Sequence, residues 1–124
     1  MPKERPKNLD LSTVKFPVTA TASILHRVSG IIIFIALSIL LFLLHCSLTN
    51  ESGFKFVAGL TDGLILKFIL WGTLTALAYH AIFGIRHMIQ DLGHWEEMQS
   101  ASVTAKFGFV LVVILSILAG VLVW

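Results

Sequence analysis

The chain has 124 residues, of which 56% are hydrophobic and only 13% are charged, and its mean hydropathy is +0.90. Soluble domains carry roughly twice that share of charged residues, so the composition excludes an ordinary water-soluble domain. The formal net charge of +2 is too small and too dispersed for a nucleic-acid-binding surface. The single cysteine, Cys46, excludes an intrachain disulfide framework and a CxxC motif, so the five histidines are the residues to follow.

Three apolar stretches, each long enough to cross a bilayer, follow one another along the chain. A spanning helix needs about 18 or more mostly apolar residues. The sequence therefore predicts an all-α integral membrane protein with three transmembrane helices. The predicted parts are a cytoplasmic or interfacial segment over 1–22, a first span over 23–46, an external loop over 47–63, a second span over 64–89, a cytoplasmic loop over 90–105 and a third span over 106–124.

The segments that flank the spans carry turn and cap signals. Prolines and basic residues in the segment 1–22 favour an irregular lead-in, and the apolar run after it is too long for a cleaved signal peptide. Thr and Ser side chains predict that the first helix starts near 19–23. The external loop has several glycines and charges and room for a short interfacial helix over 54–60.

Lysine and arginine are unevenly shared between the two sides of the predicted membrane. Seven lie before the first span, at its start or around the second loop: Lys3, Arg5, Lys7, Lys15, Arg27, Arg86 and Lys106. Only Lys55 and Lys67 lie on the other side. Because basic residues stay cytoplasmic, the N-terminus and the second loop are predicted to face the cytoplasm of a bacterium. Trp71 and Trp124 then lie near the outer interface, where membrane proteins concentrate aromatic residues.

A polar cluster lies at the start of the first span. Ser23, His26, Arg27 and Gly30 follow the spacing i, i+3, i+4, i+7 and share one helix face. Polar groups within a span are costly, which makes them candidates for function. For Arg27 alone, an equally ordinary interpretation is a side chain that reaches out to lipid phosphates.

A second polar stripe, His80, Gly84, His87 and Asp91, lies at the end of the second span. His80 is well inside the hydrocarbon region and needs a partner, and a haem iron, which imidazole nitrogen ligates well, is one candidate. Gly84 would let a flat macrocycle approach the backbone. The alternatives are that His80 bonds to a neighbouring helix, with Tyr79 in helix packing, and that Gly84 only permits close packing.

The sequence shows no obvious second axial ligand. His80 and His87 lie two turns apart on one helix and cannot hold one iron together. The remaining donors are His26, His45 or a histidine of another chain, with a partner helix favoured because His45 lies at the opposite face and His94 in a loop. The groups at the cytoplasmic interface, Arg27, His26 and His87, suit haem propionates or the carbonyl oxygens of a quinone. Ser23 can donate a proton to a carbonyl, and Asp91 can pair with Arg27 or stay solvated.

These segments resemble the cytochrome b membrane-anchor subunit of succinate dehydrogenase, respiratory complex II, of the proteobacterial type. The resemblance covers nearly the whole chain, and it is carried by RPKNLDL at 5–11, FP at 16–17, SILHRVSG at 23–30, HAIFGIRH at 80–87 and Asp91. It implies a complex in which a flavoprotein oxidises succinate, an iron-sulfur subunit passes electrons on, and two anchor subunits share one haem b and a ubiquinone site.

The resemblance also assigns roles to single residues. It implies that His80 is one axial ligand of the haem iron, with the other ligand supplied by the second anchor. Ser23 and Arg27 would belong to the ubiquinone site, His26, Arg27 and His87 to the haem propionate region, and Asp91 would support them. No residue is expected to carry dehydrogenase chemistry.

Three other functions remain open at this point. An anchor of a quinol:fumarate reductase would use the same parts in the opposite direction, and a cofactor-free structural anchor or a small proton-coupled transporter subunit would use neither haem nor quinone. In each case we expect a multi-pass protein of the bacterial inner membrane, with the lipid bilayer as its surroundings and no nucleic-acid partner.

Overall fold

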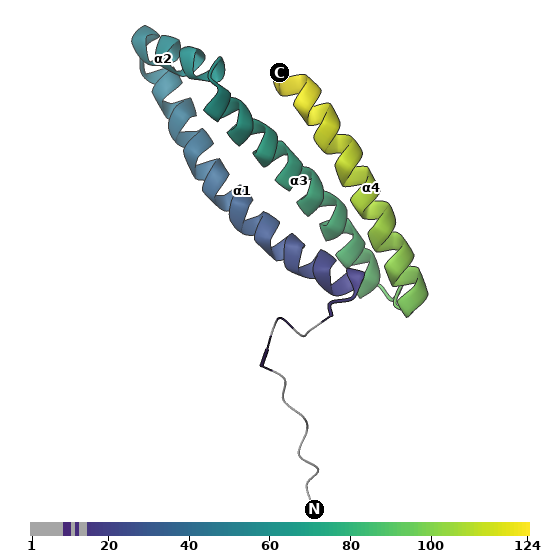
Figure 1. Ribbon diagram of the computed structural model, residues 1–124. Helices are drawn as coiled ribbons and strands as arrows, with labels where there is room; N and C mark the ends of the chain where they lie inside the picture. Colours follow the sequence, from purple (N-terminus) through teal and green to yellow (C-terminus); the bar gives the residue numbers. More distant parts are fainter. Residues whose placement is uncertain (1–8, 11, 13–14) are drawn as a thin grey trace, which may run out of the picture.

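The computed structural model describes residues 9–10, 12 and 15–124, and within this part of the chain the only regular elements of four or more residues are helices. The order is α1 (Val18–Thr49), α2 (Glu51–Thr61), α3 (Leu64–Asp91) and α4 (Met98–Val123). Helices α1, α3 and α4 are long and apolar enough to cross a membrane, which confirms the predicted all-α architecture with three such helices. Figure 1 shows them running side by side, with α2 across one end.

The long helices extend beyond the apolar stretches that predicted them. Helix α1 begins at Val18, directly after Pro17, rather than near 19–23, and the Pro17 carbonyl accepts the first backbone bond from Thr21 at 3.1 Å. Helix α4 begins at Met98 rather than at 106. Backbone hydrogen bonds define a helix, whereas apolarity defines a membrane span, so polar turns lengthen the helix without lengthening the span. The positions of the membrane boundaries along each helix stay predictions.

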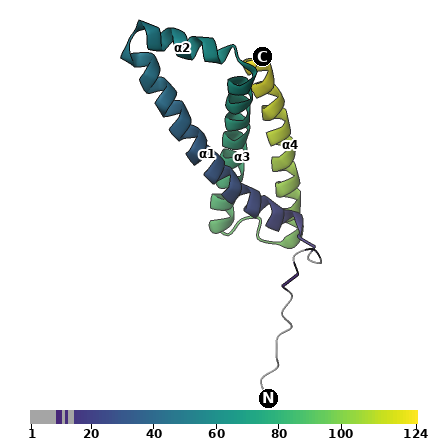
Figure 2. The same ribbon diagram turned by 60° about the vertical axis from the view of Figure 1, so that its left-hand side comes forward.

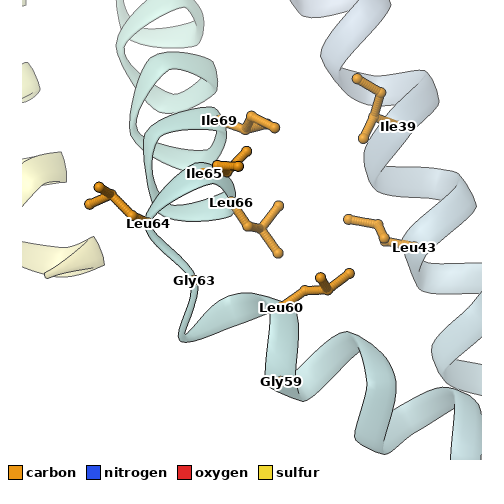
Figure 3. A pocket seen from close by; sticks show the side chains of 9 residues that line it. All are labelled: Ile39, Leu43, Gly59, Leu60, Gly63, Leu64, Ile65, Leu66 and Ile69. Atoms are coloured by element: carbon orange, nitrogen blue, oxygen red, sulfur yellow. The ribbon is translucent and has the colours of Figure 1, made fainter.

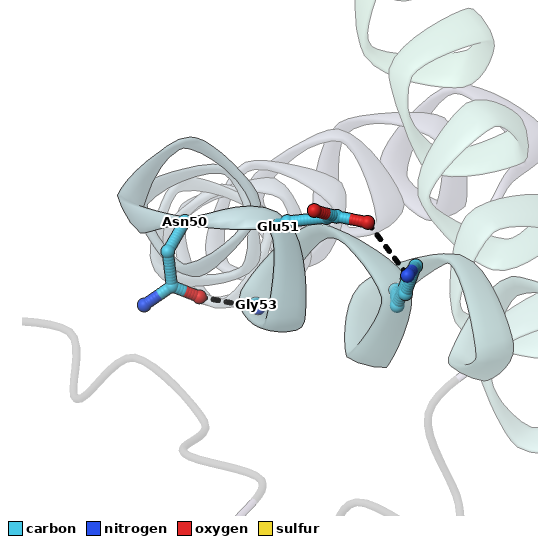
Figure 4. Close-up of polar contacts among 4 residues, drawn as sticks. Asn50, Glu51 and Gly53 are labelled. Atoms are coloured by element: carbon cyan, nitrogen blue, oxygen red, sulfur yellow. Dashed lines mark hydrogen bonds and ion pairs between the residues drawn. The ribbon is translucent and has the colours of Figure 1, made fainter.

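Helix α2 is longer than the segment 54–60 suggested, because its start is capped. The side chain of Asn50 accepts a hydrogen bond from the Gly53 backbone N–H at 2.7 Å, and Glu51 forms an ion pair with Lys55 at 2.6 Å (Figure 4). A Cβ on Gly53 would collide with the carbonyl oxygen of Cys46. Glycine at this position therefore permits the tight turn from α1 into α2.

The core lies where the three long helices meet, near the start of α1 and α4 and the later half of α3. It consists of Ala22, Tyr79, Phe83, Ala105 and Val112. Ala22 and Ala105 have no exposed surface, and these small side chains let the helices approach closely. The Tyr79 hydroxyl donates a hydrogen bond to the Ala22 carbonyl at 2.8 Å, which confirms Tyr79 as a packing residue between α1 and α3.

Most large apolar side chains point away from this core. Phe34 of α1 is 74% exposed and Leu122 of α4 is 79% exposed, and exposed apolar side chains recur along all three long helices. A soluble protein would bury them, whereas lipid or a neighbouring membrane helix covers them without cost. The distribution agrees with three helices in a membrane.

Helices α1 and α3 separate toward the end that α2 crosses, as Figure 2 shows. A cavity of about 550 Å³ lies between the three helices there. Its lining has no polar side chain, and Leu43, Leu60 and Leu66 point into it from α1, α2 and α3 (Figure 3). In the described part of the chain, the hydrogen bonds that join α1 and α3 lie at the opposite end, around Tyr79 and His80.

Candidate functional site

Three imidazole rings gather between α1 and α3, at the end where α1 begins and α3 finishes. The rings of His26 and His80 are stacked, with their centroids 4.2 Å apart and their planes 9° from parallel. The ring of His87 lies 5.6 Å from that of His26. The structure therefore brings together the histidines of the two clusters, which are more than 50 residues apart in the chain.

Two glycines make room for these rings. A Cβ on Gly30 would lie 3.3 Å from Cε1 of His80, and a Cβ on Gly84 would lie 3.4 Å from Nε2 of His26. Each glycine thus accommodates a histidine of the opposite helix. For Gly84, the approach of a macrocycle that the sequence suggested stays a prediction.

Ser29 joins the two stacked histidines through its hydroxyl. Its Oγ donates to the carbonyl oxygen of His26 at 2.6 Å and lies 3.0 Å from Nδ1 of His80. The same Nδ1 is 3.3 Å from the His26 carbonyl. Ser29 is 4% exposed, so this contact is sealed between the helices. Sequence reasoning gave Ser29 no role, although it stands within the motif at 23–30.

His26 contributes a polar atom that has nothing to bond. Its Nε2 is buried and has no hydrogen-bond partner in the part of the chain that the structure describes. An unpaired buried nitrogen costs free energy, and such atoms mark places where a missing group belongs. Spacing could not have revealed this atom, because its burial depends on α3.

The predicted quinone residues lie at the same end of α1 as His26 but form no hydrogen bond with the stacked rings among the described residues. Ser23 is half-buried, Arg27 is exposed, and neither side chain bonds to any described residue. Asp91 is also exposed and forms no ion pair with Arg27, since Lys55–Glu51 is the single pair among the described residues. The expected support of Arg27 by Asp91 is therefore not made in this structure.

Arg86 is a buried cation that sequence reasoning counted only for orientation. It is 6% exposed, and its Nη2 donates to the Ala101 carbonyl at 2.8 Å. Its Nε donates to Thr104 Oγ1 and its Nη1 to Gln90 Oε1, both at 3.2 Å. The guanidinium thus ties the end of α3 to the start of α4. In the sequence, the feature that could have revealed this role was the charge of Arg86, one position before His87.

Three aromatic rings form a cluster at the far end of α3 and α4. The ring of Phe68 lies 5.1 Å from that of Trp124 and 6.3 Å from that of Trp71. The indole Nε1 of Trp71 donates to the Ser116 carbonyl at 2.9 Å. These contacts fasten α3 to α4 at the end opposite the histidines, while the place of Trp71 and Trp124 at a membrane interface stays a prediction.

The side chains around the histidine cluster limit which kinds of metal group it could bind. The described residues contain no group of three or more His, Cys, Asp or Glu side chains arranged to hold a metal ion. A single imidazole is enough for a metal that already has most of its ligands from a macrocycle. By its architecture and site, the chain is a small membrane protein with three candidate spanning helices and an imidazole cluster between two of them.

Comparison with known proteins identifies the family. Residues 1–119 match the family described as succinate dehydrogenase/fumarate reductase transmembrane subunit. The chain therefore belongs to this family, whose members are membrane subunits of an oxidoreductase complex, and the resemblance seen in the sequence is confirmed.

The relatives are of similar length and come from bacteria and a plant. The chain is 37% identical to the succinate dehydrogenase cytochrome b556 subunit of Coxiella burnetii, with 100% of both chains covered. It is 33% identical to the subunit of the same name of Rickettsia felis, over 98% of this chain and 91% of the relative. A cytochrome b560 subunit of Marchantia polymorpha is 35% identical over 76% of this chain and 72% of its own.

Proposed function

We propose that this chain is a membrane-anchor subunit of a succinate:ubiquinone oxidoreductase. In this proposal it binds haem b together with a second anchor subunit and contributes to the site where ubiquinone is reduced. The observation that carries it is the imidazole cluster between α1 and α3, in a family whose relatives are named cytochrome b556 subunits. The chain itself has no dehydrogenase role, which belongs to the soluble subunits.

The residues around His80 suit a haem. Nδ1 of His80 is engaged by Ser29, while Nε2 has no hydrogen-bond partner among the described residues and is available to an iron. His26 offers a second unpaired nitrogen beside it. His80 would be an axial ligand, and His26, Arg27 and His87 would serve the propionates. A haem there supplies one-electron transfer within the membrane.

The stacking of His26 on His80 supports a second axial ligand from another chain. Two axial imidazoles lie on opposite faces of a macrocycle, but the ring centroids of His26 and His80 are only 4.2 Å apart. That distance leaves no room for a macrocycle between them. The second anchor subunit is the donor that the proposal requires, and the large exposed apolar faces of α1, α3 and α4 offer it a surface.

Ubiquinone reduction would use Ser23 and Arg27. The Arg27 guanidinium is exposed and unpaired among the described residues, so it is free to donate to a quinone carbonyl. Ser23, one turn earlier on the same helix, can donate a second hydrogen bond. Asp91 lies near this end of the molecule as a supporting acid. Reduction adds negative charge to the carbonyl oxygen, and a fixed cation stabilises that charge.

The remaining parts of the proposal concern partners and location. The flavoprotein and iron-sulfur subunits would sit on the cytoplasmic side, where the histidine end of the helices faces in the predicted orientation. The membrane would be the bacterial inner membrane. An anchor of a quinol:fumarate reductase is the alternative, since the family description covers both enzymes. The relatives' names favour succinate oxidation.

The proposal is tested on the native complex, purified through a tag on this chain. We expect a dithionite-reduced minus oxidised spectrum with a b-type haem band, and succinate-dependent quinone reduction that exceeds quinol-dependent fumarate reduction. A complex without haem would favour the cofactor-free anchor and overturn the haem part of the proposal. A reversed activity ratio would assign the chain to a fumarate reductase.

A further inference from the structure

We propose that Ser29 is the positioning residue of the haem site: its hydroxyl fixes which nitrogen of His80 carries the proton and so leaves Nε2 as the ligand atom. This inference rests on the proposed function, because it concerns the same haem. It goes beyond the proposed function by giving a role to Ser29, which stands within the motif at 23–30 but to which neither the sequence analysis nor the comparisons assign one.

The two contacts of Ser29 determine which nitrogen of His80 carries the proton. The Ser29 Oγ is 2.6 Å from the His26 carbonyl oxygen, which can only accept, so the single hydroxyl proton of Ser29 points there. Only lone pairs of Oγ then remain for Nδ1 of His80 at 3.0 Å. Nδ1 must therefore carry the proton in the neutral imidazole. The lone pair of the ring is consequently on Nε2.

The surroundings of His80 also restrict the orientation of its ring. His80 is confined on one side by the parallel ring of His26 and on another by Gly30, where even a Cβ would lie 3.3 Å from Cε1. The hydrogen bond to Ser29 adds a directional restraint within this slot. A ring that is held at Nδ1 presents Nε2 in one direction, which is what an axial ligand needs.

Ser38, another serine in the middle of α1, lacks the contact that distinguishes Ser29. The Ser38 hydroxyl donates to the Phe34 carbonyl of its own helix at 3.0 Å, and it forms no hydrogen bond to another helix among the described residues. Ser29 makes the same kind of local bond to His26, but it also reaches His80 across the interface. Ser38 is therefore a matched control for the loss of a helical serine hydroxyl.

A hydrogen bond from Nδ1–H makes Nε2 a stronger electron donor to a bound metal. Stronger donation stabilises oxidised iron more than reduced iron, so it lowers the reduction potential. The variant Ser29→Ala leaves Nδ1 with only the longer contact of 3.3 Å to the His26 carbonyl. We therefore expect the midpoint potential of the haem to rise in Ser29→Ala and to return toward the parental value in Ser29→Thr, which keeps a hydroxyl.

The experiment is a potentiometric titration of the haem band in purified complexes of the parent, Ser29→Ala, Ser29→Thr and Ser38→Ala, with an electron paramagnetic resonance spectrum of each oxidised haem. The assembled fraction is measured, so a lower yield does not affect the result. The inference predicts a higher potential and an altered low-spin signal in Ser29→Ala alone. Parental values in Ser29→Ala, or the same shift in Ser38→Ala, would overturn it.

The variant His80→Ala distinguishes a failure of the haem assignment from a failure of the role proposed for Ser29. If His80→Ala removes the low-spin signal while Ser29→Ala changes nothing, the haem assignment stands and the role of Ser29 is wrong. If His80→Ala leaves the low-spin signal intact, the assignment of His80 itself fails, and the positioning role of Ser29 fails with it.

Discussion

An imidazole between membrane helices needs a partner for each of its nitrogens, and His80 has one for Nδ1 only. The neighbouring His26 also has an unmet nitrogen, because its Nε2 is buried and has no hydrogen-bond partner among the described residues. Two unmet nitrogens from opposite helices, in rings 4.2 Å apart, are costly unless a further group meets them. The proposed haem, with its iron on His80 and a propionate near His26, would satisfy both.

The variant His80→Ala tests the axial assignment directly. We expect the reduced haem band to shift and the low-spin signal of the oxidised haem to be lost, because one of two strong-field ligands is gone. Some haem can stay bound through the second anchor, with water in the vacant position. The control His45→Ala, an exposed histidine at the other end of α1, should keep the parental spectrum. An unchanged low-spin signal in His80→Ala would contradict the assignment.

The variants Ser23→Ala and Arg27→Leu test the quinone site. A hydrogen bond from a charged group is worth about 1.5–3 kcal/mol, so Arg27→Leu should slow succinate-to-quinone turnover roughly tenfold or more. Ser23→Ala should have a smaller effect in the same direction. Succinate oxidation with a soluble dye should stay near the parental rate, since the dye draws electrons before they reach the membrane site.

The informative quantity for these variants is the ratio of quinone-linked to dye-linked activity at equal amounts of assembled enzyme. Lys106→Leu removes another exposed basic side chain from the predicted cytoplasmic side and should leave the ratio unchanged. A parental ratio and parental inhibitor sensitivity in Arg27→Leu would return Arg27 to the alternative of a lipid-facing anchor.

Sequence spacing identified the histidines of this site but not their surroundings. The i, i+3, i+4, i+7 pattern places His26 on one face of α1, yet it says nothing about which ring of α3 it meets. The roles of Ser29 and Arg86 depend on partners far along the chain, such as His80 and Ala101. Such pairs follow from how the helices cross, and a single sequence does not contain that information.

At the scale of helices, apolar runs predicted the three long elements well but misplaced some of their ends. Helix α4 starts at Met98 because its first backbone bond joins Ala101 N to Glu97 O at 2.9 Å, in a polar segment that hydropathy assigns to a loop. The Arg86 guanidinium then fastens this polar turn to α3 through the Ala101 carbonyl. Local hydrogen bonding therefore extends the element beyond its membrane-spanning part.

The contact between α3 and α4 depends on Gly108. A Cβ at this position would lie 2.9 Å from Cζ of Phe83, whose side chain is only 1% exposed. We expect Gly108→Ala to destabilise the assembled complex by about 1–3 kcal/mol, as overpacking does. The measurement is the thermal midpoint of the detergent-purified complex.

Two further variants show whether the cause is this contact. Gly120→Ala, on the same helix, places a Cβ at an ordinary 3.7 Å from Trp71 and should leave the midpoint nearly unchanged. Combining Gly108→Ala with Phe83→Leu should cost less than the sum of the two single changes, because the smaller side chain makes room. If the destabilisations of the two single variants simply add, the Phe83 ring is not what limits the size of the side chain at position 108.

At the scale of the whole molecule, the two ends of the helix bundle differ in chemistry. One end holds the three imidazoles and the buried Arg86, and the other holds an apolar cavity of about 550 Å³ and the aromatic cluster of Trp71, Phe68 and Trp124. Most of the outer surface is apolar. This polarity along the bundle is what an anchor needs if redox groups approach it from one side of the membrane only.

The seven-to-two distribution of lysine and arginine predicts that the histidine end faces the cytoplasm, and reporter fusions test this prediction. Ser52 and His94 flank opposite ends of α3, so they must lie on opposite sides if α3 spans the membrane. We expect fusions after Arg5 or His94 to fluoresce with a cytoplasmic reporter, and a fusion after Ser52 to be active with an alkaline phosphatase that works only outside. The reverse pattern would place the histidine end outside, away from soluble subunits in the cytoplasm, and electrons from succinate could then not enter at the quinone site that Ser23 and Arg27 are proposed to form.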